Sequence, residues 1–229
     1  MVIGNGMVAR SFAHLQEDPD VIIFASGVSN SQTSVQSAFD RERALIHQYV
    51  DQPGLFVYFS TISVLYPCLA ESPYVHFKRA IEQDILETFS RAIIFRLPNL
   101  VGPTANPHTL TNYLWSAVKS GMPFDIHRQA TRYLLDVEHM AILCTRDITQ
   151  FESNTIRPIA LDNKAGIEVF VRIFEDILGK SANFRLVDRG CDISIPTIPP
   201  EALERLGIPF TNGPDYNAMV LRKYYSDQI

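Results

Sequence analysis

The sequence lacks the signatures of several protein classes. It has no apolar run near the ~20 residues of a membrane span, and its N-terminus lacks the charged start and apolar stretch of a secretory signal. The three cysteines form no CxxC motif and the six histidines no HxxxH or HExxH motif, so no metal site is predicted. A net charge of −5 gives no basic footprint for nucleic acid. We therefore expect a cytoplasmic protein with no nucleic-acid, membrane or metal partner.

The composition is that of a globular chain. Hydrophobic residues make up 46% and charged residues 20% of the 229 residues, which allows a sizeable core and argues against disorder. The sequence shows no internal repeat, low-complexity segment or linker. We expect a core over residues 1–105. Residues 106–229 are expected to form a mixed α/β region that packs on this core as a small lid and adds further core elements.

Apolar runs alternate with helical segments in the N-terminal half. Strands are predicted at Met1–Ile3, Asp20–Ala25, Leu55–Phe59 and Ala92–Leu97, and helices at Arg10–Gln16, Ser34–Val50 and Tyr74–Phe89. Continuous apolar runs indicate strands that are buried on both faces. This alternation predicts a parallel sheet with helices on both faces. Right-handed crossovers would bring Gly4, Ser26, Thr61 and Asn99 to one rim of the sheet.

The C-terminal half is less regular. Helices are predicted at Leu110–Ser120, Glu138–Ile148, Ala165–Leu178 and Glu201–Leu206, and strands at Arg132–Val137, Pro158–Leu161 and Phe184–Val187. In the first half, the charged run Asp40–Arg43 is interpreted as a solvated helix face.

Tyr74 precedes Lys78 by four residues, so a helix would place both side chains on one face. A phenol alone titrates near pH ~10. An ammonium beside it favours the phenolate and brings its pKa toward the range of an acid–base catalyst. The same spacing is common in ordinary surface helices. The pair is therefore a candidate site that needs support from the rest of the chain.

The glycine-rich turn after the first strand has the pattern GxGxxA. Gly4 permits a tight turn, Gly6 lets a pyrophosphate approach the backbone, and Ala9 lets the helix pack closely on the strand. The helix N-terminus would offer N–H groups to phosphates. The alternative is a turn that merely needs two glycines.

Small polar residues follow two further strands. The Ser26–Ser31 segment follows one strand, and Ser60–Ser63 closes the next. Ligands of open α/β sheets bind at the carboxyl ends of the strands. The first segment is therefore a candidate cofactor wall, and the second offers hydroxyls to a substrate oxygen. A simple polar turn is the alternative for each.

Four motifs occur in a characteristic order. They are Gly4-x-Gly6-x-x-Ala9, Phe59-Ser60-Thr61, Tyr74-x-x-x-Lys78 and Arg96–Pro103. Together they resemble the extended short-chain dehydrogenase/reductase family, which comprises nucleotide-sugar epimerases, dehydratases and ketoreductases. The segment Arg132–Glu138 also looks like that family's R-D-F-x-x-V-x-D segment, which lies near the substrate. The resemblance covers most of the chain. It implies a Rossmann-like, doubly wound α/β fold with a small C-terminal substrate-side subdomain.

The resemblance also implies roles for individual residues. Tyr74 would be the general acid/base, Lys78 would hold the nicotinamide ribose, and Thr61 would bond the reacting oxygen. The implied cofactor is NAD or NADP, and the implied substrate is a nucleotide-activated sugar. The implied cofactor-binding residues are Gly4, Asn5, Gly6, Met7, Val8, Ala25, Ser26, Gly27, Ser60, Lys78, Pro98 and Leu100. Substrate contacts are expected from Asn99, Asn106 and Arg132.

The chain departs from the family pattern between its first two strands. Family members carry two more strands there, whereas only Glu17-Asp18-Pro19 intervenes in this sequence. Those strands normally supply the residue that separates NAD from NADP, so the cofactor preference stays open. We therefore expect a reduced number of sheet strands.

The family resemblance also bears on the reaction subclass and on a possible homodimer. The dehydratases carry an Asp-Glu pair where this chain has Ile62 and Ser63, so dehydration is disfavoured. Reductase and epimerase both stay open. The missing strands also suggest an alternative, a non-catalytic Rossmann-like binding or scaffold module in a sugar or polysaccharide pathway. In family relatives, the helices that correspond to residues 34–50 and 74–89 form a homodimer contact, and we consider the same contact for this chain.

Overall fold

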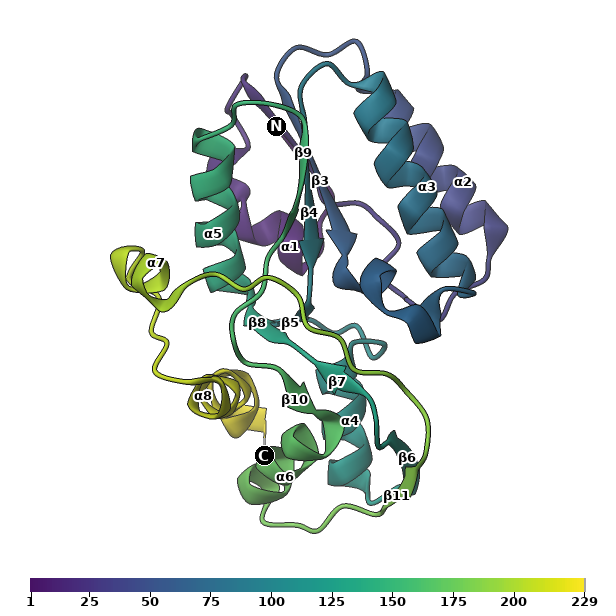
Figure 1. The fold of residues 1–229 in the computed structure, drawn as a ribbon, viewed down its shortest axis with the longest axis vertical. Coiled ribbons are helices and arrows are strands. Elements are labelled where there is room, and N and C mark those ends of the chain that lie inside the picture. The colour runs from purple at the N-terminus through teal and green to yellow at the C-terminus, as the bar shows by residue number, and fades with distance from the viewer. Residues whose placement is uncertain (229) are drawn as a thin grey trace. The chain divides into compact units, whose positions relative to one another are not determined.

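The computed structural model describes residues 1–228, and the chain falls into two compact units (Figure 1). Unit 1 comprises Met1–Leu97 and Met140–Ile159. Unit 2 comprises Pro98–His139 and the chain from Ala160 onward. The sequence thus leaves unit 1 after its fourth strand and returns to it with one helix and one strand.

Unit 1 is built on a five-stranded parallel sheet with the order β1-β2-β3-β4-β9. The strands are β1 (Val2–Ile3), β2 (Val21–Phe24), β3 (Leu55–Thr61), β4 (Ala92–Leu97) and β9 (Thr155–Pro158). Helices α2 (Gln36–His47) and α3 (Pro73–Thr88) cover one face. The other face carries α1 (Met7–Ser11) and α5 (Val137–Thr149) (Figure 1). The predicted Rossmann-like, doubly wound α/β fold is confirmed.

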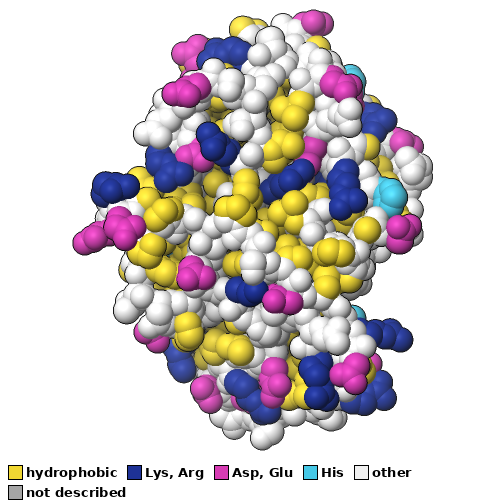
Figure 2. Space-filling model, in the orientation of Figure 1, with side chains coloured by type: hydrophobic (Ala, Val, Ile, Leu, Met, Phe, Trp, Pro, Cys, Tyr) yellow, Lys and Arg dark blue, Asp and Glu magenta, His cyan; other side chains and the backbone are white. Residues whose placement is uncertain are grey.

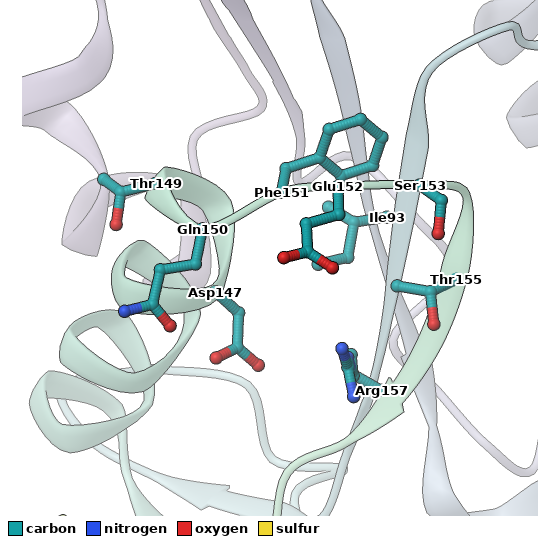
Figure 3. Close-up of a pocket in the computed structure, with 9 residues that line it drawn as sticks. All are labelled: Ile93, Asp147, Thr149, Gln150, Phe151, Glu152, Ser153, Thr155 and Arg157. Carbon is teal, nitrogen blue, oxygen red and sulfur yellow. The ribbon is translucent and has the colours of Figure 1, made fainter.

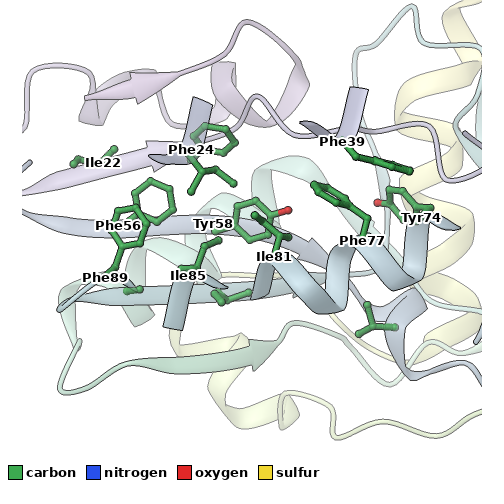
Figure 4. Packing of buried hydrophobic residues seen from close by; sticks show 14 of the residues in the cluster. Ile22, Phe24, Phe39, Phe56, Tyr58, Tyr74, Phe77, Ile81, Ile85 and Phe89 are labelled. Atoms are coloured by element: carbon green, nitrogen blue, oxygen red, sulfur yellow. The ribbon is translucent and has the colours of Figure 1, made fainter. Parts of the chain in front are cut away.

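Aromatic side chains fill the space between the sheet and the α2/α3 layer (Figure 4). Phe56 of β3 stacks on Phe89, with ring centroids 4.1 Å apart. Phe39 of α2 stacks on Phe77 of α3 at 4.6 Å. Side chains alternate along a strand, and Phe59 of β3 accordingly stacks on Phe12 in a separate contact. This alternation explains why the strand is apolar throughout.

Two elements of unit 1 differ from the predicted ones. The helix predicted at Arg10–Gln16 begins earlier, directly after the glycine turn, and ends before Phe12. A 3₁₀ turn, η1 (Ala13–Leu15), continues the chain. Phe12 is completely buried and lies at the C-cap of α1, where its backbone is no longer helical. Two further 3₁₀ turns, η2 (Ile62–Leu65) and η3 (Pro67–Leu69), connect β3 to α3.

Unit 2 contains three short strand pairs. β5 (Asn99–Val101) pairs in parallel with β8 (Leu134–Asp136), β6 (Phe124–His127) in parallel with β11 (Phe184–Val187), and β7 (Thr131–Arg132) antiparallel with β10 (Ala165–Gly166). Its helices are α4 (Leu110–Ser120), α6 (Ile167–Leu178), α7 (Pro200–Arg205) and α8 (Gly213–Tyr225), followed by η4 (Ser226–Gln228). The sequence patterns predict none of α8, β5 and β6.

Three aromatic rings mark the core of unit 2. Trp115 of α4, Phe174 of α6 and Tyr225 of α8 meet with ring centroids 5.0–5.5 Å apart. Each ring comes from a different helix, so this contact joins the three helices. The last helix is therefore an integral part of unit 2.

Basic and acidic side chains are interspersed on the face shown in Figure 2, with no large area of one sign. Among residues 1–228, no helix is both long and apolar enough to cross a bilayer.

Candidate functional site

Helix α3 carries a polar stripe on its buried side. Tyr74, Lys78 and Glu82 follow one another at intervals of four residues, which places them on one face. Their exposures are 7%, 1% and 2%. The predicted shared face of Tyr74 and Lys78 is therefore present, and it faces the interior of unit 1 rather than solvent.

The Lys78 ammonium is bonded within the core. Its Nζ donates to Glu42 Oε1 at 2.9 Å and to the Tyr58 hydroxyl at 2.7 Å. The same Nζ lies 5.7 Å from the centroid of the Tyr74 ring. Lys78 thus stands beside Tyr74, as expected, but its closest partners are a carboxylate and a second phenol that the sequence analysis does not single out.

Glu42 is completely buried. Its Oε1 accepts a hydrogen bond from Tyr58, and its Oε2 accepts one from the Val28 backbone N–H at 2.6 Å. The interpretation of Asp40–Arg43 as a solvated face is therefore wrong for this residue. Glu42 lies three residues after Phe39, on the apolar face of α2. That position was the available signal for a buried carboxylate.

A second ion pair, partly buried, lies one turn further along α3. Arg96 of β4 contacts both carboxylate oxygens of Glu82 at 2.6–3.2 Å. The Ser60 hydroxyl, predicted to contact the cofactor, donates to Glu82 Oε1. In this structure Ser60 thus belongs to a network that joins β3 and β4 to α3.

Tyr74 differs from the expected acid–base catalyst in its pKa. Burial raises the pKa of the Tyr74 hydroxyl well above its usual range, and the Glu42 carboxylate raises it further. Burial also lowers the pKa of Lys78, against the opposing effect of Glu42. The sequence pattern predicts an ammonium beside the phenol, but not the carboxylate that pairs with it. Burial, and after it the Glu42 carboxylate, therefore favour the neutral form of the Tyr74 phenol.

Thr61 ends β3 and caps the N-terminus of η2. Its hydroxyl oxygen accepts a hydrogen bond from the Ser63 backbone N–H at 3.0 Å. A threonine hydroxyl can donate and accept at once, so its hydrogen remains usable for a substrate oxygen. This geometry is compatible with the role that the resemblance implies.

The glycine turn has two predicted functions, a tight turn at Gly4 and phosphate access at Gly6, and the structure supports the first of them clearly. Gly4 has a φ of 123°, and a Cβ there would lie 2.5 Å from the Ala25 carbonyl oxygen, so the close approach of β2 requires glycine. A Cβ on Gly6 would meet no atom within 4 Å, which leaves room for a ligand. Asn5, Met7 and Val8 complete the predicted set in this turn and in α1.

The segment after β2 closes over the buried ion pair. A Cβ on Gly27 would lie 3.0 Å from Glu42 Oε1 and 3.2 Å from Lys78 Nζ. The neighbouring Ser26 carbonyl accepts a hydrogen bond from Arg41. Unit 1 therefore brings together the predicted residues of the glycine turn, the segment after β2 and α3.

The donors present here are compatible with the nicotinamide end of a dinucleotide, the role that the resemblance implies. An ammonium has three hydrogens, of which Glu42 and Tyr58 take two, so Lys78 retains one for a ribose hydroxyl. The open space at Gly6 would admit phosphate. The adenosine end has no comparable support. β1 is an edge strand whose only neighbour in the described sheet is β2, so the further strands that carry the adenosine-side residue in the family are missing from this sheet.

The other predicted residues lie in unit 2. Pro98 directly precedes β5, and Leu100 lies in it. Asn99 donates from its amide to the Tyr133 carbonyl at 3.4 Å. Asn106 accepts from the His108 N–H, and Arg132 donates to the Thr131 carbonyl. Their roles in substrate binding stay predictions.

A pocket of about 540 Å³ in unit 1 is lined by none of Tyr74, Lys78 and Thr61 (Figure 3). Its lining includes Ile93 and Thr155, near the amino ends of β4 and β9, whereas Thr61 marks a carboxyl end. Asp147, Glu152 and other polar side chains surround it. Within residues 1–228, no cluster of ligating side chains suits a metal ion.

No protein-family profile and no curated protein matches the chain. Solved structures resemble it at low identity. The UDP-glucose-4-epimerase of Stenotrophomonas maltophila, with bound NAD and formylated UDP-arabinopyranose, is 19% identical with a TM-score of 0.67, and the match covers 99% of this chain and 82% of that chain. The UDP-N-acetylglucosamine 4-epimerase of Methanobrevibacter ruminantium M1, in complex with UDP-N-acetylmuramic acid, is 17% identical with a TM-score of 0.66, covering 100% and 84%.

A third match is RMD from Pseudomonas aeruginosa, complexed with NADPH. It is 15% identical with a TM-score of 0.63, and the match covers 99% of this chain and 89% of that chain. At such identities the likeness is one of fold. The chain therefore has the Rossmann-like fold of these structures, with a shorter sequence.

Proposed function

We propose that the chain is an NAD(P)-dependent reductase or epimerase of a nucleotide-activated sugar. The observation that carries this proposal is the position of Tyr74 and Lys78 on one face of α3, with the Lys78 Nζ 5.7 Å from the Tyr74 ring centroid. The fold, which is that of NAD-bound and NADPH-bound structures, supports it. NAD and NADP are equally compatible with the described residues.

In this proposal, Tyr74 exchanges a proton with the hydroxyl or keto oxygen of the substrate, and Thr61 donates a hydrogen bond to the same oxygen. Lys78 offers its third hydrogen to a ribose hydroxyl. A bound nicotinamide would supply or accept the hydride. Asn99, Asn106 and Arg132 are proposed to contact the nucleotide sugar.

Tyr74→Phe tests the proposal directly. The variant removes the exchangeable proton and keeps the ring, so turnover of nucleotide sugars should fall by at least ~10²-fold, while NADH and NADPH affinity stays close to that of the wild type. Tyr113→Phe is the matched control, because Tyr113 is 47% exposed in unit 2. Full activity of Tyr74→Phe would reject this mechanism.

A second candidate is a non-catalytic binding or scaffold module. The ion pair of Lys78 with Glu42 favours it, because the ammonium assigned to the cofactor is already bonded. Calorimetric titration with NADH and NADPH separates the candidates. A folded protein that binds neither nucleotide supports the module.

The proposal also includes a homodimer through residues 34–50 and 74–89, and a cytoplasmic location. The apolar side chains Phe39 and Ile46 are buried inside unit 1, so they give no support for the dimer. The exposed faces of α2 and α3 would have to form the contact. Sedimentation velocity at micromolar concentration tests this part of the proposal.

A further inference from the structure

The two hydrogen-bond partners of Lys78 are buried, as Lys78 itself is. Glu42 comes from α2 and Tyr58 from β3, and both are completely buried. The Tyr58 hydroxyl donates to Glu42 Oε1 at 2.5 Å while it accepts from the Lys78 Nζ. The three groups thus form a closed triangle of hydrogen bonds.

The carboxylate of this triangle cannot easily turn away. The Val28 backbone N–H holds Oε2 at 2.6 Å, so both oxygens are bonded. Gly27 lies so close to the pair that a Cβ at this position would be 3.0 Å from Glu42 Oε1 and 3.2 Å from Lys78 Nζ. The Lys78 ammonium is therefore held at Glu42 of α2, next to the segment that follows β2.

We propose that Glu42 is a positioning residue for the nicotinamide site, and that it weakens the hold of Lys78 on the ribose of a bound nicotinamide nucleotide. This inference rests on the proposed function. Its physical basis is competition for one ammonium. A hydrogen bond between an ammonium and a carboxylate is roughly twice as strong as a neutral one, so Glu42 sets the position of the ammonium, and Lys78 can offer its third hydrogen to a ribose hydroxyl only from that position.

A loosely held cofactor narrows the reaction class. In a ketone reduction, the carbonyl carbon gains a hydride from the dihydronicotinamide, and the oxygen gains the proton of Tyr74. The oxidised cofactor must then leave, and the Tyr74 phenolate regains a proton from solvent. An epimerase must instead retain its nicotinamide between two opposite hydride transfers. Weak retention fits the reductase.

The test compares nicotinamide affinity among isosteric variants. NADH and the reduced nicotinamide mononucleotide are titrated by fluorescence at about pH 6, far below the pKa of a free lysine. The mononucleotide lacks adenosine and isolates the nicotinamide end. Glu42→Gln should bind both probes roughly tenfold more tightly than the wild type, the effect of about one hydrogen bond. Glu82→Gln is the control, because Glu82 is equally buried on α3 but bonds Ser60 and Arg96.

A second variant guards against a folding defect in the first. Glu42→Asp keeps both charges and shortens the carboxylate side chain by one methylene, so it should hold the ammonium less closely and also tighten binding. Circular dichroism verifies the fold of each variant. Adding Lys78→Met to Glu42→Gln should remove the gain.

The outcomes separate the two proposals. Equal affinity of the wild type and Glu42→Gln would overturn this inference and leave the nicotinamide site standing. Absence of binding in all folded variants would overturn the proposed function, and the inference with it. Tighter binding in Glu42→Gln and Glu42→Asp, but not in Glu82→Gln, supports both.

Discussion

Lys78 and Glu42 form an ion pair from which solvent is excluded, with side-chain exposures of 2% and 0%. Removing two charges from water costs several kcal/mol per ion, which their attraction offsets only when further hydrogen bonds complete the site. Tyr58 and the Val28 N–H provide those bonds. Because its members come from α2, β3 and α3, the pair fixes these elements relative to one another rather than adding a large net stability.

Loss of one partner should therefore be costly. Lys78→Met leaves the Glu42 carboxylate buried without its counter-charge, and we expect the free energy of unfolding to fall by about 3–5 kcal/mol. Urea denaturation followed by circular dichroism measures this. The double variant Lys78→Met/Glu42→Gln should be more stable than Lys78→Met alone.

The matched control breaks an exposed ion pair. Arg185→Met removes the contact with Asp125, where the side-chain exposures are 77% and 46%, and should leave stability nearly unchanged. If Lys78→Met were no more harmful than Arg185→Met, the buried pair would not contribute as described.

At the scale of single elements, α2 shows what local patterns predict and what they miss. The spacing of Phe39 and Ile46 predicts the helix correctly. The burial of Glu42 on the same face depends on Tyr58 and Lys78, which lie 16 and 36 residues away. Local spacing cannot reveal a partner at that separation. The one available hint is Tyr58 itself, since a phenol inside an apolar strand needs a hydrogen-bond partner.

Helix α8 escapes prediction for a related reason. Asn212 caps its start by accepting from the Asp215 N–H, a common start signal. Its buried face, however, includes Tyr216 and Asn217, whose partners are His139 and Asn163 in other parts of unit 2. Polar residues on the buried face weaken the apolar periodicity from which helices are predicted.

The packing of α8 gives an element-scale prediction. Leu221 is completely buried, and Leu221→Ala should lower the free energy of unfolding of unit 2 by about 2–5 kcal/mol. The fluorescence of Trp115, the single tryptophan, reports this unit during urea denaturation. Arg222→Ala is the control, because the Arg222 side chain, next to Leu221 in the chain, is 52% exposed. Equal effects of the two substitutions would mean that α8 does not pack on the core of unit 2.

For the whole molecule, the sequence predicts the sheet well because βα alternation is a local property repeated along the chain. The return of residues 140–159 to unit 1 is different. It depends on β9 pairing with β4, with Ile94 opposite Ile156, and a non-local pairing leaves no mark in either segment alone. The same holds for the site. Tyr74, Lys78 and Thr61 follow from motifs, whereas the charge balance around them depends on distant partners.

Unit 2 buries phenols that its unfolded chain would expose, so its stability should depend on alkaline pH. Burial raises the pKa of Tyr216, and it raises the pKa of Tyr225 to about 12. An unfolded tyrosine titrates near pH ~10. Above this pH the unfolded chain releases protons that the folded unit retains. The contribution of each phenol is therefore complete below pH ~10 and is lost as the pH rises through the folded pKa.

Urea denaturation followed by Trp115 fluorescence should accordingly show constant stability up to pH ~9. Above pH ~10, it should decline by about 1.4 kcal/mol per pH unit for each such tyrosine. Tyr225→Phe should reduce that slope by one such contribution, whatever it does to stability at neutral pH. Tyr113→Phe, at a largely exposed position, should leave the slope unchanged. An unaltered slope in Tyr225→Phe would show that the folded unit does not hold this proton more tightly than the unfolded chain does. The decline would then come from charge repulsion over the whole surface.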